Sequence, residues 1–224
     1  MIKVYAVNIR NIKGIEDIAT THITNERLKR IDRLFFLEDK KRCLVAELII
    51  HFYMRNVKNN ANYNISIDDN GKPQLVYFSD VFFNISHSGD WVVCAFSNYE
   101  IGIDIEKIKD AKMNVARKYY SDDEYKKMIC IHNNTEQNEF FYLLWTLKES
   151  YLKNIGMGIT ALSPKISFDT SKNIKGYIDC EKIEKKFFSQ KFDDNYYLSI
   201  CYDLNEKIIE NKYFCILDFE QLFV

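Results

Sequence analysis

The stretch from Ile101 to Glu106, IGIDIE, places two carboxylates two residues apart in a run of isoleucines. On a β-strand, residues two apart share a face, so Asp104 and Glu106 point together while the isoleucines point the other way. Adjacent carboxylates on a buried strand repel each other unless a cation neutralises them, and Mg²⁺ prefers carboxylates combined with phosphate oxygens. The pattern fits a divalent-cation site. A strand with one solvated face is the alternative that the same residues allow.

The segment WTLKESYLK, residues 145–153, adds a third carboxylate on a predicted helix. Residues four apart lie on one helical face, which brings Trp145, Glu149 and Lys153 together. An exposed Glu–Lys pair is the alternative, but apolar neighbours around most of the helix predict a half-buried Glu149 that needs a partner. Glu149 fits a metal ligand or a general base, and Lys153 fits a phosphate or leaving group. Lys148 points about 100° away, so we expect it to pair with another acid and orient the helix.

Three further segments could bind phosphate. The run Ser86-His87-Ser88-Gly89 supplies hydrogen-bond donors between two strand-like segments, although a simple hairpin turn is the alternative. Gly71-Lys72-Pro73 places a lysine in a turn, where backbone groups are open to a ligand. A basic segment could bind a phosphate-rich ligand through two or three of its cations, the rest suiting a solvated helix surface: Arg27, Lys29, Arg30, Arg33, Lys40, Lys41 and Arg42.

The hydrophobic pattern predicts the elements that hold these residues. Alternating and apolar runs predict strands at 2–9, 64–68, 74–78, 82–86, 91–97, 100–106, 164–169, 175–182, 195–203 and 212–218. Helical periodicity covers 24–55 with a break near Glu38 and Asp39, then 113–119, 122–131 and 135–154. Each half therefore has a long aromatic-rich helix followed by strands, which predicts an α+β fold.

The composition describes a globular chain of 224 residues, 47% hydrophobic and 15% aromatic. A net charge of −1 argues against a nucleic-acid footprint, so any electrostatic site must be local. No apolar run approaches the roughly 18 residues of a membrane span, and the first residues lack a signal-peptide pattern. The six cysteines show no C-x-x-C spacing, which favours a reducing, cytoplasmic location.

Taken together, the chain resembles the 4′-phosphopantetheinyl transferases, specifically the Sfp-type subgroup. That family carries a G-[IV]-D motif and, farther along, a [WF]-x-x-K-E-[SA]-x-x-K motif. Gly102-Ile103-Asp104 and residues 145–153 match these motifs. Gly71-Lys72-Pro73, the FNISHS run at 83–88 and a glycine pair after the helix match in order and spacing. The resemblance covers residues 20–160 by motif and the C-terminal residues by strand pattern.

The resemblance implies two similar α+β halves, residues 1–106 and 107–224, related by a pseudo-twofold axis with the active site at their interface. The implied enzyme is a Mg²⁺-dependent phosphopantetheinyl transferase of the holo-[acyl-carrier-protein] synthase type. It would move the 4′-phosphopantetheine arm of coenzyme A onto a serine of an apo acyl or peptidyl carrier protein. The other product would be adenosine 3′,5′-bisphosphate.

The resemblance also assigns roles to residues. Asp104, Glu106 and Glu149 would hold Mg²⁺, with Mn²⁺ as the alternative ion. Asp104, Glu149 and Lys153 would carry catalysis, Glu149 or a metal-bound water serving as the base. Coenzyme A would contact a larger set: Arg27, Arg30, Arg42, Lys72, Pro73, Ser86, His87 and Lys153.

The implied partner is a small acidic carrier protein from fatty-acid, polyketide or nonribosomal-peptide biosynthesis. It would dock near residues 107–125, where cationic and aromatic side chains suit an acidic helix. An internally duplicated chain can build its site as a monomer, and neither nucleic acid nor membrane is expected as a partner. Two other functions stay open: a non-catalytic module that binds coenzyme A or carrier protein, and a metal-dependent nuclease, which Lys107 disfavours because it faces away from Glu106.

Overall fold

The computed structural model describes residues 1–12, 23, 25–208 and 213–223, without the side chains of 25–27 and 159. In the first part of the chain the elements are β1 (Lys3–Asn8), α1 (Asn25–Asp32), α2 (Leu37–Asn56), β2 (Asn64–Ile67), β3 (Pro73–Val76), β4 (Phe82–Ser88), β5 (Trp91–Ser97) and β6 (Ile101–Lys107). Three helices follow: α3 (Met113–Tyr119), α4 (Asp122–Ile129) and α5 (Asn134–Asn154). The remaining strands are β7 (Ile166–Asp169), β8 (Lys175–Ile178), β9 (Glu181–Lys182), β10 (Lys186–Phe192), β11 (Tyr196–Tyr202) and β12 (Phe214–Leu217), and short 3₁₀ turns occupy Ile159–Ala161 and Phe219–Phe223.

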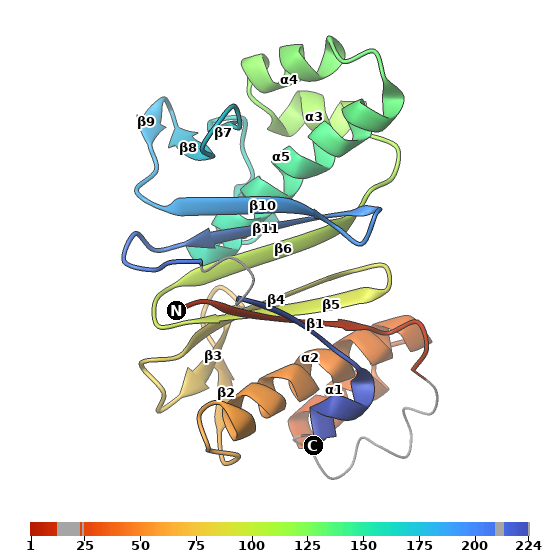
Figure 1. The fold of residues 1–224 in the computed structure, drawn as a ribbon, viewed down its shortest axis with the longest axis vertical. Helices are drawn as coiled ribbons and strands as arrows, with labels where there is room; N and C mark the ends of the chain where they lie inside the picture. Colours follow the sequence, from red (N-terminus) through yellow and green to blue (C-terminus); the bar gives the residue numbers. More distant parts are fainter. Residues whose placement is uncertain (13–22, 24, 209–212, 224) are drawn as a thin grey trace.

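Two sheets form the centre of the molecule, each covered by one long helix (Figure 1). The first sheet has the order β12-β1-β5-β4 and packs against α2, while the second has the order β10-β11-β6 and packs against α5. One apolar core lies between α2 and the first sheet, a second between the two sheets, and a third between α5 and the second sheet. The main layers are therefore helix, sheet, sheet and helix.

The strands β1 and β5 are buried on both faces because they lie in the middle of this stack. In β1, Val7 belongs to the core under α2, and Val4 and Ala6 belong to the core between the sheets. In β5, Phe96 faces α2 and Val93 faces the second sheet. This double burial explains the uninterrupted apolar run WVVCAF, since a half-exposed strand would alternate with polar residues.

The contact between β6 and α5 depends on Gly102. A Cβ atom at this position would lie 2.0 Å from the backbone oxygen of Ser150 and 2.4 Å from the backbone nitrogen of Asn154. Only glycine allows the helix to lie this close to the strand. The alternation along β6 then sends Ile101, Ile103 and Ile105 into the core between the sheets and the acidic residues toward α5.

The α+β prediction is confirmed, with differences in detail. The predicted helix break near Glu38 lies earlier, at residues 33–36, and the predicted strand at 175–182 is two strands, separated by left-handed residues Asp179 and Cys180. The edge strand β10 was missed. The division at 106/107 and the pseudo-twofold stay predictions; the pairing shows β6 beside β11 and β12 beside β1.

All six cysteines lie in described residues and none forms a disulfide, and the reducing, cytoplasmic location stays a prediction. Cys94 and Cys201 are buried inside strands β5 and β11, as small apolar side chains would be. Among the described residues, no helix combines the length and the apolar character needed to cross a membrane.

Candidate active site

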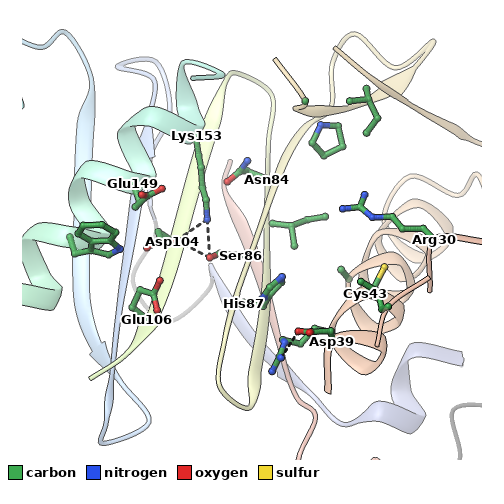
Figure 2. A pocket seen from close by; sticks show the side chains of 18 residues that line it. Arg30, Asp39, Cys43, Asn84, Ser86, His87, Asp104, Glu106, Glu149 and Lys153 are labelled. Atoms are coloured by element: carbon green, nitrogen blue, oxygen red, sulfur yellow. Dashed lines mark hydrogen bonds and ion pairs between the residues drawn. The ribbon is translucent and has the colours of Figure 1, made fainter. Parts of the chain in front are cut away.

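A cavity of about 630 Å³ lies between the acidic side chains of β6 and α5 and the cationic side chains of α1 and α2 (Figure 2). Residues 84–87 of β4 also line it, together with Gly71 and Pro73. The lining contains most of the predicted site residues: Arg30, Arg42, Pro73, Ser86, His87, Asp104, Glu106, Trp145, Glu149 and Lys153. The predicted metal-binding acids and the predicted phosphate-binding cations therefore face one shared space.

The acidic side of the cavity combines two carboxylates from β6 with one from α5. Asp104 and Glu106 share the face of β6 that meets α5, and Glu149 lies on the facing side of the helix (Figure 2). Asp104 Oδ2 and Glu149 Oε1 are buried and have no hydrogen-bond partner among the described residues. Buried carboxylate oxygens without a partner are costly, so this cluster is built to receive something positive.

The pKa values of two of these carboxylates are displaced upward. Burial, and after it the charge of Asp104, raise the pKa of Glu149 to about 7. Burial and the same neighbouring charge also raise the pKa of Glu106 above its usual value. Both pKa values rise because a buried carboxylate loses solvation and because a neighbouring negative charge disfavours its ionised form. A cation among these groups would relieve both effects.

Lys153 supplies part of that positive charge in the structure. Its Nζ donates to Asp104 Oδ1 at 2.7 Å, to Ser86 Oγ at 2.9 Å and to the carbonyl of Ile103 at 3.2 Å. All three ammonium protons are thereby used. Trp145, Glu149 and Lys153 all line the cavity, which confirms the predicted shared face of the helix.

The opposite side of the cavity is cationic. Arg42 donates to the carbonyl of Gly89 at 2.8 Å and pairs with Asp39 at 2.6 Å, so its guanidinium is held at the end of the β4–β5 turn. Arg30 also reaches this side, and His87 lies between it and the carboxylates (Figure 2). Desolvation, and then the charges of Arg42 and Lys153, lower the pKa of His87. A phosphate placed here would reverse that effect by stabilising the protonated ring.

The three carboxylates suit a divalent cation by their chemistry, although they are not gathered around one point. Within the described residues, no three His, Cys, Asp or Glu side chains form a ready metal-binding group. Carboxylate oxygens are the ligands that Mg²⁺ and Mn²⁺ prefer, and two of those present are buried with no partner in the described part of the chain. The donor set therefore fits such an ion.

The chain matches proteins of a known family. A family model described as the 4′-phosphopantetheinyl transferase superfamily matches residues 100–201, and one described as the N-terminal part of a 4′-phosphopantetheinyl transferase matches residues 16–99. A 4′-phosphopantetheinyl transferase of Bacillus subtilis is 31% identical over 194 residues, covering 84% of this chain and 85% of the relative. This chain belongs to the 4′-phosphopantetheinyl transferase superfamily.

Two further relatives agree with the assignment. The 4′-phosphopantetheinyl transferase gsp of Aneurinibacillus migulanus is 36% identical over 177 residues, covering 77% of this chain and 73% of the relative. The transferase Sfp of Bacillus subtilis strain 168 is 30% identical over 185 residues, covering 80% and 81%. The predicted Sfp-type resemblance and the predicted phosphopantetheinyl transfer are confirmed at the level of the family. These relatives are Sfp-like, so the narrower holo-[acyl-carrier-protein] synthase label is not carried over.

Of the residues predicted to contact coenzyme A in this transferase, two already bond to other parts of the chain and one has a side chain that is not described. The Lys72 ammonium pairs with Glu100 and donates to the Asn154 carbonyl at 2.9 Å, and Lys72 does not line the cavity. The Ser86 hydroxyl donates to Asp104 at 2.8 Å and accepts from Lys153 and from the Ile105 N–H, which uses its full hydrogen-bonding capacity. The side chain of Arg27 lies outside the described part of the chain.

Asp39 is a site residue that the sequence analysis missed. It pairs with Arg42 three residues later on α2, a spacing that places two side chains on one helical face. That spacing was the signal that could have identified it. Asp90, in the turn between β4 and β5, is turned toward Arg10, with an Oδ2–Nη2 distance of 2.8 Å.

The predicted acidic partner of Lys148 is Glu124. The two side chains are buried and lie 2.9 Å apart, and Lys148 also donates to the carbonyl of Ile166. Glu124 accepts from the backbone N–H groups of Ser121 and Phe168 as well. This network fixes α5, which carries Glu149 and Lys153, against α4 and β7, and Lys148 itself does not line the cavity.

Proposed function

We propose that this chain transfers the 4′-phosphopantetheine arm of coenzyme A to a serine hydroxyl of an apo acyl or peptidyl carrier protein. The serine oxygen forms a bond to the phosphorus of the pantetheine phosphate, and the pyrophosphate P–O bond to the nucleotide breaks. The hydroxyl proton passes to a base, and adenosine 3′,5′-bisphosphate leaves. The observation that carries this proposal is the cavity in which carboxylates and Lys153 face Arg30, Arg42 and His87.

The two sides of the cavity suit the two ends of the nucleotide. His87, Arg42 and Arg30 offer positive or ionisable groups for the 3′-phosphate. Lys153 offers its ammonium to the pyrophosphate once it exchanges Asp104 for a phosphate oxygen. Phosphoryl transfer relies on such positioning and charge neutralisation more than on covalent chemistry by the protein.

Glu149 is the base in this proposal. A serine hydroxyl is a weak nucleophile at neutral pH, and a general base works best when its pKa lies near the working pH. Burial raises the pKa of Glu149 to about 7 in the metal-free chain, and a bound cation would lower it again. The support for Glu149 as the base is therefore its position at the cavity wall beside Asp104. The Glu149 Oε1 atom, which has no hydrogen-bond partner in the described ranges, is available for the serine proton.

Asp104, Glu106 and Glu149 would hold the divalent cation, Mg²⁺ or Mn²⁺. When bound, the ion supplies positive charge to the pyrophosphate oxygens. Its support here is the donor set: three carboxylates at one wall of the cavity and two buried oxygens without partners among the described residues. The carrier would dock at residues 107–125, where Lys109, Lys112, Arg117 and Lys118 are exposed.

The decisive experiment weighs apo carrier proteins by mass spectrometry after incubation with the purified chain, coenzyme A and Mg²⁺. We expect the carrier protein to gain the mass of one phosphopantetheine, and we expect no gain in reactions that contain EDTA. Fatty-acid, polyketide and nonribosomal-peptide carriers tested in parallel would identify the substrate class. Coenzyme A binding without any mass gain would instead favour the non-catalytic binding module.

The nuclease alternative gains no support from the site. A nuclease lysine would be expected beside the β6 carboxylates, but Lys107 lies 3.8 Å from Asp90 and over the ring of Tyr196. The lysine that does reach the acids, Lys153, comes from α5 within the matched transferase motif.

A further inference from the structure

Strands β4 and β6 run side by side but belong to different sheets. Side-chain oxygens of β4, rather than its backbone carbonyls, accept hydrogen bonds from the backbone N–H groups of β6. Asn84 Oδ1 accepts from the N–H of Ile103 at 2.9 Å, Ser86 Oγ from that of Ile105 at 3.2 Å, and Ser88 Oγ from that of Lys107 at 3.1 Å. Every second residue of a strand points to the same face, at the same repeat distance on both strands. Three acceptors on β4 can therefore each face one N–H donor on β6.

This arrangement also fixes where the serine hydroxyl protons go. A hydroxyl has one proton to donate, and each oxygen already accepts a backbone N–H of β6. Ser86 donates to Asp104 Oδ1 at 2.8 Å, and Ser88 donates to Glu106 Oε2 at 2.7 Å. Each serine therefore binds the backbone of β6 and a carboxylate of the same strand, one residue apart.

We propose that Ser88 is a positioning residue that orients Glu106 toward the divalent cation of the transfer reaction. The inference rests on the proposed function, because it assumes that Glu106 is a ligand. Ser88 differs from Ser86 in bonding neither Asp104 nor Lys153, so its effect passes through Glu106. Hydrogen-bond partners of metal-ligating carboxylates fix the ligand's orientation, and losing one typically weakens metal binding or activity by roughly 10–100-fold.

The test measures Mn²⁺ binding by electron paramagnetic resonance in the presence of saturating coenzyme A. We expect Ser88→Ala to weaken Mn²⁺ binding roughly tenfold and Ser88→Thr, which keeps the hydroxyl, to restore it. Ser88→Cys keeps a similar volume with a weak donor and should also bind Mn²⁺ more weakly. The affinity for coenzyme A, measured in EDTA, should stay unchanged in all three variants.

The chain provides a matched control in Ser97. This buried serine donates to Glu206 Oε1 at 2.9 Å, on β5 and away from the cavity. Ser97→Ala loses a similar serine–glutamate bond, so thermal unfolding should respond comparably while Mn²⁺ binding stays at the wild-type level. A merely structural role for Ser88 would make the two alanine variants indistinguishable in Mn²⁺ affinity.

The possible results distinguish a failure of the positioning role of Ser88 from a failure of the proposed transferase function. Unchanged Mn²⁺ affinity in Ser88→Ala and Ser88→Cys, with wild-type protein binding the ion, would overturn the positioning role and leave the transferase intact. Equal weakening in Ser97→Ala would also overturn it. A wild-type chain that transfers phosphopantetheine but binds no Mn²⁺ would overturn the cation role of Glu106, and the inference with it.

Discussion

The surroundings of Glu149, rather than its residue type, set its pKa. In sequence it is one of many glutamates, and on an exposed helix it would be a surface acid with a lysine four residues later. In the structure it lies in a wall of carboxylates, where burial raises its pKa to about 7. The same residue type at the start of α5, Glu136, is exposed to solvent. Burial next to Asp104, rather than residue type, makes Glu149 suited to proton transfer.

Replacing Glu149 by Gln tests this role at the residue scale. The amide cannot accept the serine proton, so we expect kcat to fall by about 10²–10⁴ while coenzyme A binding in EDTA changes little. Steady-state transfer kinetics and calorimetry would measure the two effects. Glu136→Gln makes the same change on the same helix and should leave both unaltered. If Glu149→Gln keeps its activity, a different group is the base.

His87 provides a second residue-scale prediction. If the ring contacts the 3′-phosphate, His87→Ala should raise KM for coenzyme A about tenfold, the usual order for one hydrogen bond to a charged group. With 3′-dephospho-coenzyme A as substrate, the variant and the wild type should show equal KM. His132, which is exposed and away from the cavity, gives the control His132→Ala. An equal loss with both substrates would place His87 elsewhere on the nucleotide.

At the scale of elements, the site depends on how closely α5 lies on β6. Glu149 and Lys153 come from the helix, and Asp104 comes from the strand. The distance between these elements is set at Gly102, where the backbones of Ser150 and Asn154 leave no space for a Cβ. The glycine of the G-I-D motif is therefore a packing residue. It lets α5 lie close to β6, which brings Glu149 and Lys153 to Asp104, two residues farther along the strand.

Gly102→Ala should displace the helix from the strand. Overpacking at a backbone contact costs about 3 kcal/mol, so we expect a loss of that order in the free energy of unfolding together with a marked fall in kcat. Urea denaturation and transfer kinetics would report the two effects. Gly158→Ala is the control, because the nearest described atom beyond its chain neighbours, Thr160 Oγ1, would lie 3.9 Å from the added Cβ. Wild-type stability in Gly102→Ala would contradict the packing argument.

The surface formed by residues 107–125 is the predicted docking site of the carrier protein. Lys112 and Arg117 are exposed at α3, and a double charge reversal to Glu should repel an acidic carrier. KM for the carrier should rise at least tenfold, with KM for coenzyme A unchanged. Lys126 and Lys127 on α4 offer the matching reversal outside the segment. Equal effects of the two double variants would argue against docking at 107–125.

At the scale of the whole molecule, the four layers bury several tyrosines that the chain does not use in the cavity. Tyr53 on α2 stacks on Phe96 of β5, with ring centroids 3.7 Å apart. Burial is the main cause that raises its pKa to about 12. Because the folded state keeps this proton longer than the unfolded state does, its contribution to stability is complete below pH 10 and is lost as the pH rises to 12.

Alkaline unfolding tests this packing. Between pH 10 and pH 12, one such group lowers the free energy of unfolding by about 1.4 kcal/mol per pH unit. Tyr53→Phe should remove that contribution and give a correspondingly shallower pH dependence in urea denaturation. Tyr77 is almost fully exposed, so Tyr77→Phe should retain the wild-type slope. An unchanged slope in Tyr53→Phe would mean that the hydroxyl is solvated in the native state.

Local geometry made a large part of this protein predictable. The two-residue period of a strand placed Asp104 and Glu106 on one face, and the period of a helix placed Trp145, Glu149 and Lys153 together. The same reasoning directed Lys148 away from Glu149 and toward an acid. These predictions succeeded because a residue's face within an element depends only on backbone geometry, which the sequence pattern reveals.

Tertiary structure alone decided the contacts between distant elements. The sequence did not show that the hydroxyl oxygens of Ser86 and Ser88 accept backbone N–H groups of the neighbouring strand β6, and their contacts with phosphate stay predictions. Nor did the sequence show that the Lys72 ammonium donates to the Asn154 carbonyl at the end of α5, and the contact of Lys72 with the nucleotide also stays a prediction. The edge strand β10, with few buried positions, gave too weak a pattern to be recognised. Such contacts depend on which elements pack together, and no local period in the sequence records that choice.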